Sequence, residues 1–145
     1  MTDRSERAVL NHLIETCKDA ERGFRHVAEH AKDPMVKSLF LDIASQRARF
    51  AADLLPHAQR LGGANASDGT KAGALHRTWI ELRSALFRDD AGAVLHEAER
   101  GESFSRSVYQ DALDGMLPPS ARELVESQFT ELQKTASRLQ ELENS

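Results

Sequence analysis

The chain has 145 residues, of which 40% are hydrophobic and 29% are charged, and its formal net charge is −4. These values predict one globular domain spanning residues 1–145 and exclude a disordered chain, while no apolar run approaches the roughly 18 residues that a membrane span needs. The lack of a long basic run argues against nucleic acid as a partner, and a polar N-terminus without the apolar core of a signal peptide predicts a cytoplasmic protein.

The first periodic segment runs from about Ser5 to Ala31. Its apolar residues recur in steps of three and four, which is typical of a helix with one buried face. These residues are Leu10, Leu13, Ile14, Cys17, Phe24, Val27, Ala28 and Ala31. The segment must end near Asp33 and Pro34, because a residue that precedes proline disfavours the helical conformation.

A second helix is predicted to begin at the same point, since aspartate is a good N-cap and proline suits the first helical position. Its apolar residues continue at helical spacing as far as Leu61, and Gly62 with Gly63 ends it. Pro56 lies inside this segment. We expect it to bend the helix or to end it early, because proline lacks the backbone N–H and its ring clashes with the preceding turn.

The rest of the chain continues the helical pattern. Residues 62–69 are a loop by composition, and a shorter helix is predicted after them. The apolar face of this short helix consists of Leu75, Trp79, Leu82 and Leu86. A third long helix ends near Gly115, and a fourth follows Pro118 and Pro119. No sustained alternation of polar and apolar residues indicates a strand.

Four long helices of about 25 residues, each roughly 40 Å long, predict an all-α fold. The loop and the extra short helix between the second and third long helices can carry the chain from one end of a bundle to the other. A four-helix bundle with one such long crossover is of the ferritin-like type. A simple up-down-up-down bundle is the alternative.

Each long helix carries one strongly polar residue near the middle of its apolar stripe, when the stripe is plotted at about 100° per residue. These residues are Glu21, Arg47, Glu102 and Gln128. In a bundle of nearly parallel helices, we expect the four side chains to meet in one buried layer. Because an uncompensated buried charge is costly, the layer must be satisfied internally.

Two interpretations of this layer follow. In one, Glu21 and Glu102 bind iron or manganese, as carboxylates do in ferritin-like di-iron proteins, where Glu-x-x-His pairs complete the ligand set. In the other, Arg47 pairs with one or both glutamates, and Gln128 completes the hydrogen bonds. The second interpretation is favoured, because the chain contains no Glu-x-x-His and an arginine repels a metal cation.

The reverse of Glu-x-x-His, which is His-x-x-Glu, begins at three histidines: His12, His26 and His96. The glutamate that follows His96 at this spacing is Glu99. His12, His26 and His30 lie on the polar face of the first helix. We expect these three side chains to be solvated, where they can bind zinc or nickel adventitiously.

Three further residues are secondary candidates. Tyr109 lies seven residues after Glu102 on the same stripe, where a buried tyrosine both packs and hydrogen-bonds. His76 lies beside the stripe of the short helix and can cap, hydrogen-bond or bind a ligand. Cys17 is the only cysteine, so no intramolecular disulfide forms, and we expect a buried, inert thiol.

Three motifs resemble, in this order, those of a known family. They read IETCKDAERGF at residues 14–24, LHRTW at 75–79 and ERGE at 99–102. The family is an uncharacterised bacterial ferritin-like family of four-helix-bundle proteins, a domain of unknown function, and the resemblance covers about Leu10 to Gln128. It implies a ferritin-like bundle in the bacterial cytosol, and it does not imply any particular activity, because the family has no established one. The sequence departs from the family motif at Ala20, where the resemblance leads us to expect glycine.

These observations lead to three hypotheses of function. The first is a non-catalytic bundle without a cofactor, with a role in stress or in interaction with partners. The second is an iron- or manganese-binding bundle with oxidase or storage chemistry, in which Glu21 and Glu102 are ligands. The third is an assembly module, which forms a symmetric homo-oligomer or offers the apolar face of the short helix, with Trp79, to a partner.

Overall fold

The computed structural model describes residues 2–62, 80, 84–85 and 91–144. In these ranges every regular element is a helix, and the long helices are α1 (Thr2–His30), α2 (Pro34–Arg60), α4 (Ala91–Asp114) and α5 (Pro119–Asn144). The predicted all-α class is confirmed for this part of the chain. Of the predicted short helix, Ile80, Ser84 and Ala85 are helical. The remainder, including His76 and Trp79, lies outside the described residues.

Local signals explain where α2 begins and ends. The side chain of Asp33 accepts hydrogen bonds from the backbone N–H groups of Met35 and Val36, at 2.8 and 3.4 Å, so it is the predicted N-cap. At the other end Gly62 has a φ of +116°, a conformation that L side chains rarely adopt. The helix does not end early at Pro56, which is exposed and lies in the last turns before Arg60.

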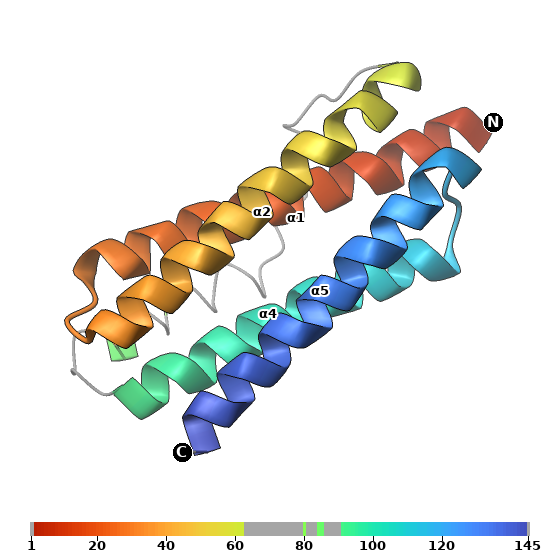
Figure 1. Ribbon diagram of the computed structural model, residues 1–145. Coiled ribbons are helices and arrows are strands. Elements are labelled where there is room, and N and C mark those ends of the chain that lie inside the picture. The colour runs from red at the N-terminus through yellow and green to blue at the C-terminus, as the bar shows by residue number, and fades with distance from the viewer. Residues whose placement is uncertain (1, 63–79, 81–83, 86–90, 145) are drawn as a thin grey trace.

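The long helices form two antiparallel hairpins, α1 with α2 and α4 with α5 (Figure 1). The hairpins meet where α1 packs against α4 and α2 packs against α5. Figure 1 also shows that α2 and α4 begin at the same end of the bundle and run in the same direction. Successive helices of a simple up-down-up-down bundle alternate in direction, so that alternative does not describe this protein.

Within the described ranges, two apolar clusters fill the bundle. The first includes Phe24 and Phe40, whose rings meet edge to face with their centroids 5.3 Å apart. The second includes Leu54 and Leu132, which are both fully buried. Burying such side chains contributes roughly 1.5–3 kcal/mol each, so the clusters supply much of the stability of the fold. From α2 and α4, the first cluster contains residues of the N-terminal halves, and the second contains residues of the C-terminal halves.

Membrane crossing requires a long and strongly apolar helix. None of the helices in the ranges given above combines that length with that apolar character.

Candidate functional site

The boundary between the two apolar clusters holds an ion pair between Arg47 of α2 and Glu102 of α4. Both side chains are 1% exposed, and Nη2 of Arg47 donates to Oε2 of Glu102. Burial disfavours the charge on Arg47, but the adjacent carboxylate more than offsets this effect, so the pKa of Arg47 lies above its ordinary value. Arg47 is therefore a permanent cation inside the bundle.

Hydrogen bonds extend from this ion pair towards α5. Nε of Arg47 donates to Oε1 of Gln46 at 3.1 Å, and Nε2 of Gln46 donates to Oγ1 of Thr135 at 3.3 Å. The Thr135 hydroxyl in turn donates to the backbone carbonyl of Glu131 at 3.1 Å. The guanidinium is thus bonded to Gln46 of its own helix, and Gln46 is in turn bonded to Thr135 of α5.

Two atoms of the ion pair have no partner within the described part of the chain. Nη1 of Arg47 and Oε1 of Glu102 are buried there and make no hydrogen bond. A buried charge pair offsets its desolvation cost only when its remaining donors and acceptors are also satisfied. The pair therefore contributes little net stability, although removing one partner alone would be costly.

A second hydrogen-bond chain crosses all four long helices. The Tyr109 hydroxyl donates to Oε1 of Gln128 at 2.6 Å, and Nε2 of Gln128 donates to the backbone carbonyl of Phe50 at 3.3 Å. Oη of Tyr109 lies 3.2 Å from Sγ of Cys17. Because the single hydroxyl proton of Tyr109 goes to Gln128, the Cys17 thiol is the donor in this contact. Gln128 therefore has both its amide oxygen and its amide nitrogen paired in the core.

The two titratable groups in this second hydrogen-bond chain, Cys17 and Tyr109, stay protonated at neutral pH. Burial raises the pKa of Cys17 from 9.0 to about 11. Burial also raises the pKa of Tyr109 well above its usual value. Since the thiolate is the reactive form of cysteine, Cys17 is inert at neutral pH.

Glu21 does not belong to this buried layer, which corrects the prediction from its helical position. Its side chain is 29% exposed and accepts from Nη2 of Arg25, one turn later, at 3.1 Å. The buried face of α1 passes instead through Ala20 and Phe24, which are each 1% exposed. Glu21 lies at the edge of that face, where a long side chain can reach water.

Glu99, His96 and His12 lie outside the layer. Glu99 is half-buried and pairs with Arg106 at 3.0 Å on the same helix. His96 is exposed and lies 2.9 Å from Glu143 of α5. His12 is half-buried, with its Nδ1 enclosed and unpartnered in the described part of the chain.

A carboxylate-bridged iron or manganese centre is the other arrangement predicted for the core. Such a centre needs several carboxylates and histidines that point at the same ions. Glu102 is engaged by a cation, and Glu21 is turned to the surface with Arg25. Among the described residues, a group of three ligand-type side chains, whose ligand atoms lie within 4.8 Å of one another, occurs elsewhere, at the end of α1. The core side chains present in these ranges do not fit such a centre.

Two members of the network were not predicted from the sequence. Thr135 lies three residues after Leu132 and four before Leu139, so its place on the apolar stripe of α5 was a usable signal. Gln46 lies beside the stripe of α2, and helical periodicity alone gives no reason to single it out. The link from Cys17 to Tyr109 joins residues 92 positions apart and becomes visible only in the fold.

The fold and the site together define a class: an all-helical bundle with charged and polar side chains buried between two apolar clusters. The model of one protein family matches residues 6–115, which is most of the chain. The chain belongs to this family, which is described as a domain of unknown function, DUF2383. Among curated proteins, no relative of the chain is found.

Proposed function

We propose that this protein is a non-catalytic, ferritin-like bundle of the bacterial cytoplasm, in which an arginine supplies the positive charge that metal ions supply in di-iron bundles. The observation that carries the proposal is the buried ion pair between Arg47 and Glu102. A guanidinium at this position neutralises the inward carboxylate and repels a divalent cation.

The directions of the helices support the ferritin-like part of the proposal. α2 and α4 run the same way, so the end of α2 and the start of α4 lie at opposite ends of the bundle, as a long crossover connection requires (Figure 1). Bundles with one such long crossover are ferritin-like. The family resemblance of the sequence motifs points to the same fold.

In this proposal the buried polar layer determines how the helices fit together. Two apolar clusters can tolerate small shifts of one helix along another, whereas a buried ion pair and a fully paired glutamine cannot. Specificity of this kind is an established use of buried polar residues in some helical assemblies. A bundle of defined shape without a reactive centre suits a role in stress or in binding a partner.

The alternative function is an iron- or manganese-binding bundle that uses Glu21 and Glu102. One observation favours it: Oε1 of Glu102 is buried and has no partner in the described part of the chain. For a centre to form, Arg47 would have to leave Glu102, and Glu21 would have to exchange Arg25 for the core.

Metal retention distinguishes the two functions. Purified, untagged protein is loaded anaerobically with ferrous iron or with manganese, desalted, and measured by elemental analysis. We expect the same metal content for the wild-type protein, Glu21→Gln and Glu102→Gln, and no oxygen uptake on adding ferrous iron. The same three proteins are also tested with His26→Gln and His30→Gln, so that metal bound by these surface histidines does not contribute to the measured metal content. One or two ions per chain that are lost with either glutamate would overturn the proposal.

The proposal includes assembly into a homo-oligomer, which is common for soluble bundles of this size. Light scattering on the purified chain measures this directly. A mass of two or more chains at micromolar concentration is expected, and a monomer throughout would contradict this part of the proposal.

A further inference from the structure

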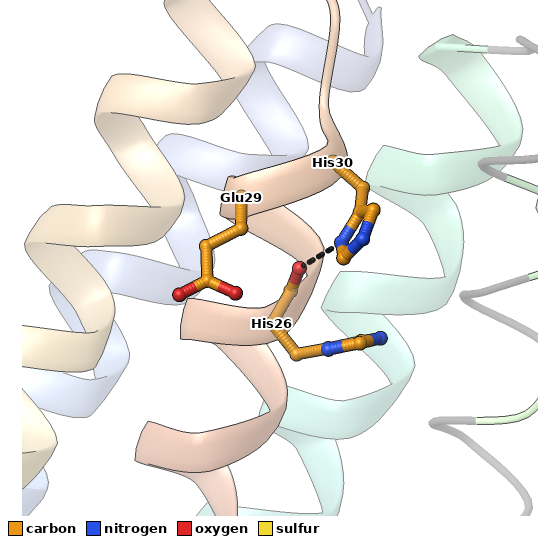
Figure 2. A group of neighbouring side chains, drawn as sticks. All are labelled: His26, Glu29 and His30. Carbon is orange, nitrogen blue, oxygen red and sulfur yellow. Dashed lines mark hydrogen bonds between the residues drawn. The ribbon is translucent and has the colours of Figure 1, made fainter.

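The last turns of α1 carry three exposed ligand-type side chains, His26, Glu29 and His30. Each offers one ligand atom, and these atoms all lie within 4.8 Å of one another. Figure 2 shows the three side chains leaving the same stretch of helix, with the two imidazole rings on one side and the carboxylate on the other. The spacing of three and four residues is what places them on neighbouring positions of the helix surface.

A hydrogen bond orients one of the rings for binding a metal. Nδ1 of His30 lies 2.9 Å from the backbone carbonyl oxygen of His26, a contact drawn in Figure 2. Because a carbonyl oxygen can only accept, Nδ1 must carry the proton, and in the neutral ring Nε2 then keeps its lone pair. Histidines that bind metals usually donate their other ring N–H to a carbonyl or a carboxylate in this way.

The position in the helix also favours a cation. His30 is the last residue of α1, and the last carbonyl groups of a helix carry a partial negative charge. The ring centroids of His26 and His30 are 4.7 Å apart, so both imidazoles lie within this region. The Glu29 carboxylate adds negative charge to the same turns of the helix, with a ligand atom within 4.8 Å of one on each histidine.

We propose that His26, Glu29 and His30 form a surface site for a divalent transition-metal cation of the zinc, nickel or copper type. Two imidazoles and one carboxylate are ligands that these ions prefer, whereas magnesium and calcium prefer oxygen ligands alone. Since all three side chains are exposed, the remaining coordination positions are open to water. The site shares no residue with the buried layer, so its existence does not depend on the proposed function.

Zinc titration of the full, untagged chain tests the site. The protein competes with a chromophoric zinc indicator, and His26→Gln, His30→Gln and Glu29→Gln are compared with the wild-type protein. We expect one zinc ion per chain and at least a tenfold weaker affinity in each histidine variant, with a smaller loss for Glu29→Gln. Magnesium at the same concentration should not compete.

His96→Gln is the matched control, because His96 is also an exposed histidine beside a glutamate but lies on α4. Its zinc affinity should equal that of the wild-type protein, and zinc should shift the ring NMR signals of His26 and His30 without shifting those of His96. The proposal is overturned if zinc does not bind saturably, or if the two histidine variants of α1 bind zinc as tightly as the wild-type protein.

Discussion

Arg47–Glu102 in the centre of the bundle and Arg25–Glu21 on its surface are the same chemical pair in opposite surroundings. The side chains of the central pair are 1% exposed, while those of the surface pair are 43% and 29% exposed. Water stabilises each ion of the surface pair separately, so their contact adds little. In the centre each ion depends on the other, because neither has water to replace a lost partner.

The largest expected effect comes from breaking the central pair. Arg47→Met leaves the Glu102 carboxylate buried without a counter-ion, and we expect the free energy of unfolding to fall by about 3–5 kcal/mol. Urea denaturation followed by circular dichroism measures this change. A loss below about 1 kcal/mol would mean that the pair is not buried in solution.

Replacing both partners is the control for this experiment. In Arg47→Met combined with Glu102→Leu, no charge remains in the core, and we expect stability within about 1 kcal/mol of the wild-type protein, or above it. If the double variant is as unstable as the single one, loss of packing rather than an unpaired charge explains the first result.

The next largest effect is expected for Tyr109→Phe. This change removes the hydroxyl that donates to Gln128 and leaves a buried amide oxygen unpaired, so stability should fall by about 1–3 kcal/mol. Chemical denaturation measures it. Combining Tyr109→Phe with Gln128→Met should restore part of the loss, and strictly additive losses would show that the two side chains do not interact.

Alkaline pH tests the burial of Cys17. Its pKa is about 11 in the folded chain against 9.0 ordinarily, so between these values the folded state binds more protons than the unfolded state. Stability is therefore retained below pH 9 and falls as the pH rises, by about 2 kcal/mol at pH 11 from this group. Denaturation of the reduced protein at several pH values should show a steeper fall than in Cys17→Ala. Parallel curves would contradict a buried thiol.

The smallest effect is expected at the surface pair. Arg25→Met removes the partner of Glu21, and the free energy of unfolding should change by less than about 1 kcal/mol because both groups reach water. The same denaturation assay compares this variant directly with Arg47→Met. A loss as large as that of Arg47→Met would place Glu21 in the core after all.

Much of the fold could be predicted because helical periodicity and capping are local properties. The apolar stripes and the Asp33–Pro34 junction depend on residues within a few turns of each other, and the structure confirms four long helices in its described ranges. Periodicity also singled out Arg47, Glu102 and Gln128, which are each at most 2% exposed. It failed for Glu21, because a stripe has edges, and a residue at an edge can turn towards either solvent or core.

The sequence by itself therefore determined the class of the fold and the inward positions of Arg47, Glu102 and Gln128, since both follow from spacing along one helix. Only the tertiary structure decided that α2 and α4 run in the same direction and that Arg47 pairs with Glu102 rather than Glu21. It also decided that Tyr109 connects Cys17 to Gln128. These choices depend on the rotation and offset of one helix against another, which are set by packing between segments far apart in the chain.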